Sequence, residues 1–133
     1  MFKTVLFPID MSPEAQQAAT LAADLVKQHH SQLVLLSVVE AKEQADHPQQ
    51  SSTQAVAALL NQAQAMFEQQ GIASKILERE GQPAFVICDV ADEIEADLII
   101  MGCRGIGLIE DAVQESVTNR VINLSPCPVL VVP

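Results

Sequence analysis

The feature that most constrains this chain is a series of short runs that are apolar at nearly every consecutive position. The clearest are TVLFPI (Thr4–Ile9), LVLLSVV (Leu33–Val39), ADLIIMG (Ala96–Gly102) and PVLVVP (Pro128–Pro133). A strand with apolar residues on both faces must be covered on both faces, which is typical of a parallel sheet between two layers of helices. A fifth, more polar run, IASKILERE (Ile72–Glu80), predicts an edge strand.

The segments between these runs have apolar residues at the spacing that is typical of an α-helix. The first predicted helix runs from Pro13 to about His30 and the second from Gln54 to Gln70, with Gly71 as its stop. A third begins at Pro83, and we expect its apolar face to comprise Phe85, Val86, Cys88, Val90 and Ile94. The fourth spans about Ser116–Leu124 and carries Val117, Val121 and Leu124. Five strands alternating with four helices predict an α/β fold with parallel strands, and residues 1–133 fit a single domain.

The charge of the chain limits its partners. Acidic residues outnumber Lys and Arg by 17 to 7, which gives a net charge of −10. This field repels DNA, RNA and anionic lipid, so we expect no nucleic-acid or membrane partner. A free anionic ligand would need local compensation or a metal ion. The acids between Asp89 and Asp97 are interpreted as a solvated helix face, and His29 and His30 as residues that suit a helix C-terminus.

The three cysteines indicate neither a disulfide framework nor a zinc site, because Cys88, Cys103 and Cys127 are widely spaced and form no CxxC pair. We expect reduced thiols in a cytoplasmic protein, with Cys88 and Cys127 packed in the core. No run approaches the length of apolar sequence that spans a membrane.

The segment GCRGIGLIEDAVQES, from Gly102 to Ser116, is the strongest candidate for a ligand site. Three glycines within six residues directly after an apolar strand would allow an anion to approach backbone N–H groups. Such a Gly-x-x-Gly pair after a strand is on its own more often a turn than a phosphate site.

Taken together, VLFPID, LVLLSVVE, GQPAFVICDVADEIEADLIIMG and RGIGLIEDAVQESVTNRVINLSPCPVLVV resemble the universal stress protein family over the full length of the chain. The resemblance implies an open five-stranded parallel sheet of order 3-2-1-4-5, with helices on both faces. Strand order reverses between strands 1 and 4, and ligands of such sheets bind at the carboxyl ends of the strands beside that point. Asp10 and Gly102 end those two strands, so both fall at the implied site.

In nucleotide-binding members of that family the motif is Gly, two residues, Gly, nine residues, then Gly followed by Ser or Thr. Gly102, Gly105 and Ser116 match it, whereas Glu115 stands in the place of the third glycine. The resemblance implies an adenine-nucleotide site. Its residues would be Pro8, Asp10, Val38, Met101, Gly102, Gly105, Glu115, Ser116 and Val117. We add Arg104, because it is the one cation inside the segment and could lie over a phosphate.

Glu115 is the departure from the family motif that bears most on the ligand. At about 5 Å and an effective dielectric of roughly 20–80, a carboxylate costs a neighbouring phosphate charge about 1–3 kcal/mol. Glu110 and Asp111 add two more carboxylates to the same segment. We therefore expect AMP, an adenosine-like ligand, or ATP bridged by Mg²⁺. The alternative is a family member that binds no nucleotide and acts only through protein–protein interaction.

The sequence offers little for catalysis, since it contains no GxxxxGK[ST] motif and no recognisable Ser–His–Asp or Cys–His arrangement. A phosphoacceptor receiver domain is disfavoured because Asp10 stands alone after the first strand and no Lys follows the last. We expect a non-catalytic regulatory module with a protein partner. In the family order the last strand lies at a sheet edge, which predicts a homodimer through Val129, Leu130, Val131 and Val132.

Overall fold

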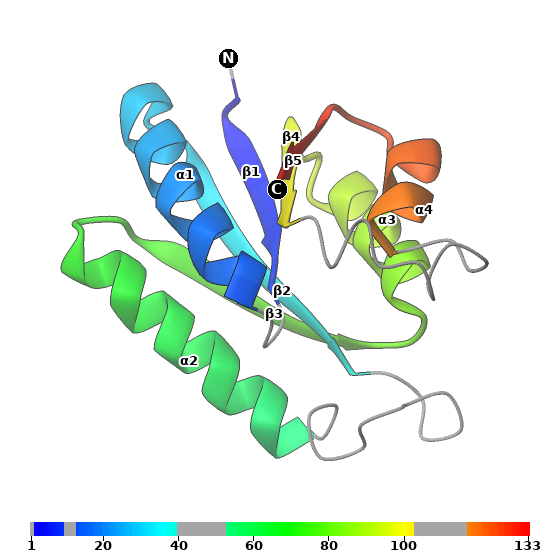
Figure 1. The fold of residues 1–133 in the computed structure, drawn as a ribbon, viewed down its shortest axis with the longest axis horizontal. Helices are drawn as coiled ribbons and strands as arrows, with labels where there is room; N and C mark the ends of the chain where they lie inside the picture. The colour runs from blue at the N-terminus through cyan, green and yellow to red at the C-terminus, as the bar shows by residue number, and fades with distance from the viewer. Residues whose placement is uncertain (1, 10–12, 40–52, 103–116) are drawn as a thin grey trace.

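The structure, a computed structural model, describes residues 2–9, 13–39, 53–102 and 117–133 of the chain. Within these residues, five parallel strands alternate with four helices (Figure 1). The strands are β1 (Thr4–Pro8), β2 (Gln32–Val39), β3 (Ser74–Glu80), β4 (Leu98–Gly102) and β5 (Val129–Val132). The helices are α1 (Pro13–His29), α2 (Thr53–Gln69), α3 (Pro83–Glu93) and α4 (Val117–Leu124). The bounds agree with the expected elements to within about two residues.

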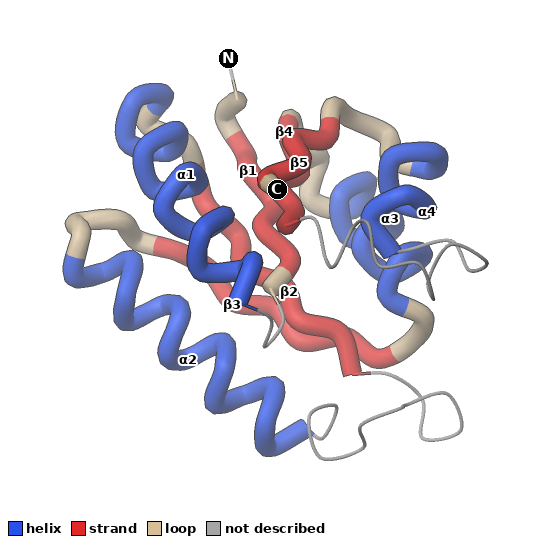
Figure 2. The backbone as a smooth tube through the Cα atoms, in the orientation of Figure 1, coloured by secondary structure: helices blue, strands red, loops and turns tan. Residues whose placement is uncertain are grey.

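The sheet order is β3-β2-β1-β4-β5, as the family resemblance implied. All four strand pairs are parallel, and β1 lies in the middle with Val5 beside Leu33 on one side and Leu98 on the other. The chain moves from β1 outward to β3 and then crosses back to β4 on the far side of β1. Right-handed crossovers in these two directions place α1 and α2 on one face of the sheet and α3 and α4 on the other (Figure 2).

Each face of the sheet has its own hydrophobic core. The first core packs Val5, Phe7, Leu33 and Leu35 against α1 and α2. The second packs the alternate residues, among them Leu6, Val34, Leu36 and Ile99, against α3 and α4. Because successive side chains of a strand point to opposite faces, strands that are apolar throughout supply both cores at once.

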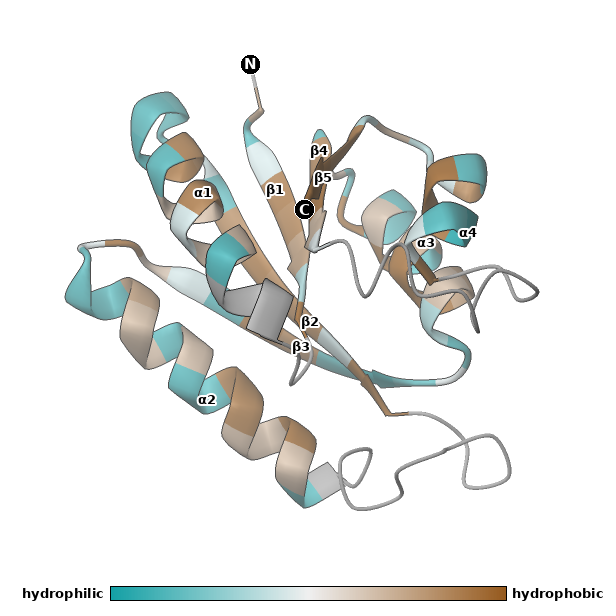
Figure 3. Cartoon of the chain, viewed as in Figure 1, coloured by the Kyte–Doolittle hydropathy of each residue, from teal (hydrophilic) through white to brown (hydrophobic). Residues whose placement is uncertain are grey.

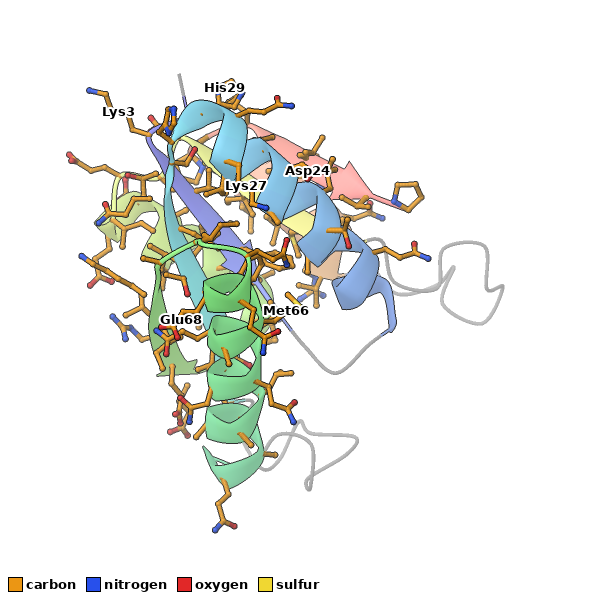
Figure 4. All side chains as sticks on the ribbon, turned by 90° about the vertical axis from the view of Figure 1, so that its left-hand side faces the viewer. Lys3, Asp24, Lys27, His29, Met66 and Glu68 are labelled. Atoms are coloured by element: carbon orange, nitrogen blue, oxygen red, sulfur yellow. The ribbon has the colours of Figure 1, made fainter. Side chains whose placement is uncertain are left out.

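α1 and α2 carry hydrophilic as well as hydrophobic residues along their length (Figure 3). Figure 4 shows Asp24 and Lys27 on α1 and Glu68 on α2, and all three residues are exposed. His29 ends α1 as expected, and its ring meets the Phe2 ring edge-on with centroids 5.3 Å apart. α2 stops before Gly71, whose φ of +81° suits the left-handed turn that ends a helix.

The predicted apolar faces of α3 and α4 are confirmed except at one residue each. Cys88 and Val90 of α3 and Val121 of α4 are buried, and Val86, Ile94 and Val117 pack against the same core, whereas Phe85 is 51% exposed and Leu124 is 49% exposed. In α3 the buried residues also include Ala84, Ile87 and Ala91, which the prediction left out. α3 carries apolar residues around most of its circumference, so the apolar pattern alone did not define which side faces the sheet.

Both described cysteines pack as expected: Cys88 is buried on α3, and Cys127 is half-buried against the same second core. Burial raises the pKa of each thiol. The acids Asp89, Asp92, Glu93, Glu95 and Asp97 are exposed, as predicted for a solvated face. Asp97 has a structural role as well, because its Oδ2 accepts a hydrogen bond of 2.9 Å from the backbone N–H of Thr4.

Candidate functional site

The point where strand order reverses lies between β1 and β4. Pro8 ends β1 and Gly102 ends β4, so the two residues stand at the carboxyl edge of neighbouring strands. This is the edge at which open α/β sheets bind ligands.

Pairing between β1 and β4 stops before Pro8, the last residue of β1. The register pairs Val5 with Leu98 and Leu6 with Ile99, and pairing ends there, although β1 pairs with β2 as far as Pro8. The backbone N–H and C=O groups of even-numbered β1 residues face β4, since the Thr4 carbonyl accepts a hydrogen bond from Asp97 N–H. In this register an N–H at position 8 would donate to the Ile100 carbonyl, and proline has none. The proline therefore opens the ladder at the carboxyl edge.

Three of the apolar residues assigned to the nucleotide lie on the same side of this opening. Met101 belongs to the second core, and Val38 and Val117 pack against that core from β2 and from the first residue of α4. Met101 is 7% exposed, whereas Val38 and Val117 are half-buried. The structure thus brings Val38, Met101 and Val117 together on the α3–α4 face, next to Pro8 and Gly102.

A hydrogen bond joins the end of β4 to the start of α4. Thr118 Oγ1 donates to the carbonyl oxygen of Gly102 over 3.1 Å, and Thr118 is 3% exposed. Thr118 was not among the residues that the sequence singled out. Its only signal in the sequence is its place two residues after Ser116, at the amino end of a helix, and this does not reveal a partner sixteen residues away.

The remaining predicted site residues, Asp10, Arg104, Gly105, Glu115 and Ser116, lie outside the described residues. Within the described ranges, His, Cys, Asp and Glu side chains form no group of three or more that could hold a metal ion. None of the helices in these same ranges has the length and apolar character needed to cross a bilayer.

The strand predicted to form a dimer, β5, is a sheet edge, and all four of its residues are half-buried. Ile99 N–H donates to the Pro128 carbonyl over 3.0 Å, so even-numbered β5 residues bond to β4. The N–H and C=O groups of Val129 and Val131 therefore point away from the sheet. No other described residue bonds to these outward groups.

The other edge, β3, has two of its outward carbonyl groups occupied by side chains. Gly81 N–H donates a hydrogen bond to the Val39 carbonyl, so the backbone groups of odd-numbered β3 residues face β2. The N–H and C=O groups of the even-numbered β3 residues therefore point away from the sheet. The Ser74 carbonyl accepts a hydrogen bond of 2.9 Å from Gln64 Nε2. The Glu78 carbonyl accepts a hydrogen bond of 3.3 Å from Arg79 Nη1. Arg79 also approaches Glu93 of α3 at 3.5 Å.

Comparison with known proteins agrees with this architecture. The chain matches the sequence model of the universal stress protein family over residues 1–133. It is 65% identical over 136 aligned positions to a universal stress protein of Synechocystis sp., covering 100% of this chain and 87% of that protein.

Solved structures share the fold. A universal stress protein in complex with cAMP superposes with a TM-score of 0.83 at 21% identity, covering 99% of this chain and 97% of that one. A family protein of Arabidopsis thaliana with AMP bound gives a TM-score of 0.74 at 17% identity, covering 98% of this chain and 90% of that one. At these identities the likeness concerns the fold.

Proposed function

The chain belongs to the universal stress protein family, and we propose that it is a non-catalytic regulatory protein that binds an adenine nucleotide where β1 and β4 end. The observation that carries this proposal is the convergence at one sheet edge of Pro8, Gly102 and the apolar side chains of Val38, Met101 and Val117. Two proteins of the same fold have been solved with adenine nucleotides, one with cAMP and one with AMP.

The features of the edge suit different parts of a nucleotide. An apolar surface formed by Val38 and Met101 suits an adenine ring, because burying ring area is favourable at roughly 25 cal/mol per Å². α4, which begins at Val117, has the positive end of its helix dipole at its amino end, and this favours a phosphate there.

We further propose that the preferred ligand is AMP, or ATP bridged by Mg²⁺. Glu115, Glu110 and Asp111 place three carboxylates in the segment that follows β4, and each additional phosphate increases the repulsion. A divalent cation would offset it by binding carboxylate and phosphate oxygens together.

The first test identifies the nucleotide released by denaturing the protein as purified, by mass spectrometry and chromatography. Calorimetric titration with AMP, ATP and Mg-ATP then ranks the ligands. We expect AMP and Mg-ATP to bind more tightly than metal-free ATP, and Glu115→Gly to raise the affinity for metal-free ATP about tenfold or more. Tight binding of ATP without metal by the unmodified protein would contradict the proposed preference, and absence of any adenine-nucleotide binding would refute the nucleotide site.

A second candidate is a family member that binds no nucleotide and acts through protein contacts alone. The outward groups of Val129 and Val131 favour a protein contact at β5 in either case. We propose that a second copy covers this edge, pairing the two β5 strands about a two-fold axis to form a homodimer, which then acts on a regulatory protein partner. Light scattering that finds a stable monomer at micromolar concentration would overturn the homodimer.

A further inference from the structure

α3 ends with charges of the sign that its helix dipole disfavours. The carboxyl end of a helix carries a partial negative charge, which Lys, Arg and His complement and which Asp and Glu oppose. α1 follows this rule, with Lys27 and His29 in its last turn. The last turn of α3 instead holds Asp92 and Glu93 and contains no basic residue. The two helices therefore differ in the electrostatics of their carboxyl ends.

The spacing of the α3 acids adds a second unfavourable interaction. Asp89 lies three residues before Asp92 and four before Glu93, so the carboxylates are neighbours on one helix face and repel one another. Arg79 Nη2 lies 3.5 Å from Glu93 Oε1, whereas neither Asp89 nor Asp92 has an ion pair with another residue that the structure describes. Local conflicts of this kind are expected at functional surfaces, which sacrifice stability for a partner.

The same face of α3 exposes an aromatic ring. Phe85 precedes Asp89 by four residues and Asp92 by seven, so the three side chains lie in one row along the helix over about 10 Å. Phe85 is 51% exposed, more than any other large hydrophobic residue in the described ranges, while Phe7 and Phe67 are fully buried. The name α3 ridge is used below for this row and the adjoining carboxylate: Phe85, Asp89, Asp92 and Glu93.

Charge selects the class of partner that fits the α3 ridge. The chain has a net charge of −10, so nucleic acid, anionic lipid and the same ridge of a second copy are repelled. Lys and Arg side chains of a partner would relieve both the repulsion between the carboxylates and their conflict with the helix dipole. A cation also binds favourably over an aromatic ring, and apolar atoms of the partner would bury Phe85. The complementary ligand is a protein segment that combines basic residues with apolar ones.

We propose that the α3 ridge is the docking site for a basic, amphipathic segment of a partner protein. The proposal rests on the regulatory protein partner proposed above, and it gives that partner a chemistry and a place on the surface. It requires neither nucleotide binding nor the pairing of β5 strands. Exposed charges carry part of the interaction, so the affinity falls as salt is raised.

The test measures binding of a fluorescein-labelled amphipathic peptide of leucine and lysine to the full chain by fluorescence anisotropy. We expect Phe85→Ala to weaken binding about tenfold, because the ring can no longer be buried. Asp89→Asn combined with Asp92→Asn should weaken binding about fivefold or more, with a smaller difference in high salt. The same double variant should unfold at a higher urea concentration, because it removes carboxylates that repel one another and oppose the helix dipole.

Matched variants on the other face of the sheet separate the α3 ridge from the charge of the whole chain. Asp24→Asn combined with Glu68→Gln removes two exposed acids, one from α1 and one from α2 (Figure 4). Leu21→Ala trims an exposed apolar residue of α1. We expect these variants to keep the peptide affinity within about twofold, since charges separated by more than a Debye length are screened.

Several results would overturn the proposal. Equal weakening by the α1 and α2 double variant would show that binding follows net charge alone, and equal affinity for a peptide with glutamate in place of lysine would exclude a basic partner. Unfolding of the Asp89→Asn, Asp92→Asn variant at lower urea would show that these acids stabilise α3. Weaker self-association of Phe85→Ala in ultracentrifugation, with unchanged peptide affinity, would assign the ridge to a second copy.

Failure of the α3 ridge can be told apart from failure of the proposed function. If the unmodified protein does not bind the leucine and lysine peptide, the docking site is refuted. The titrations with AMP and Mg-ATP then still decide the nucleotide site, and light scattering still decides the homodimer.

Discussion

β3 and β5 are the two edge strands of one sheet, and each faces outward with backbone groups that no neighbouring strand can pair. On β3 the chain itself occupies two of the outward carbonyls: Gln64 donates to the Ser74 carbonyl, and Arg79 donates to the Glu78 carbonyl. On β5 the outward groups of Val129 and Val131 receive no bond from any other residue that the structure describes. The two edges have the same backbone chemistry and differ in how it is satisfied.

The difference extends to the side chains. β3 reads SKILERE and contains four charged residues, while β5 reads VLVV and contains none. Charged side chains and occupied carbonyls both discourage the addition of another strand. β3 therefore has two of the devices by which proteins protect an edge, and β5 has neither. A sheet with one protected and one open edge is suited to pairing in one direction only, which ends at a dimer instead of a fibre.

The largest effect is expected from Val131→Pro, which removes an outward N–H of β5 without removing a bond to β4. Proline is tolerated at an edge when its missing donor faces outward. In a two-fold dimer each subunit loses the hydrogen bond that this N–H would donate to its partner. Each loss weakens association by about 1–3 kcal/mol, so the dimer dissociation constant should rise about a hundredfold or more. Analytical ultracentrifugation over a range of concentrations measures this.

Two control variants accompany that experiment. Val131→Ala trims the side chain but keeps the N–H, and we expect it to remain dimeric. Ile76→Pro makes the corresponding change at an outward position of β3 and should leave association unchanged, provided circular dichroism shows a folded protein. A dimer that withstands Val131→Pro but dissociates in Ile76→Pro would reverse the assignment of the two edges.

A smaller effect is expected from Gln64→Leu, which removes the donor to the Ser74 carbonyl. The free energy of unfolding in urea should fall by about 1 kcal/mol, since a partly buried acceptor loses its partner. Gln62→Leu is the matched control, because Gln62 is an exposed residue of the same helix. Equal losses in the two variants would show that the bond to Ser74 contributes nothing of its own.

The smallest effect is expected from Arg79→Met, which keeps most of the aliphatic stem and removes the charge. The contacts of Arg79 with Glu78 and Glu93 are long, at 3.3 and 3.5 Å, and its side chain is 39% exposed. The loss in unfolding free energy should stay below about 0.5 kcal/mol and should shrink further in high salt. A salt-independent loss of several times that size would mean that the Glu78 carbonyl depends on Arg79 far more than these distances indicate.

Much of this fold could be predicted from the sequence because the strands are apolar at consecutive positions and the helices have clear boundaries. The weak strand Ile72–Glu80 was also predicted as an edge, since its charges suit solvent on one side. The exposure of Phe85 could not be predicted, because Phe85 and Ile87 are both apolar and only tertiary packing decides which of them is buried. Thr118 was missed for a related reason: hydrogen bonds between distant residues leave no periodic signal.

The sheet register also relates the candidate site to the open edge. Gly102, at the end of β4, pairs with Val132, the last residue of β5, so a single strand separates the proposed nucleotide from the proposed subunit boundary. Thermodynamic linkage then applies to the pair of events: if nucleotide binding strengthens or weakens dimer association by some factor, association must change nucleotide affinity by the same factor. Cellular protein concentration would thereby become an input to nucleotide sensing, and nucleotide level an input to assembly.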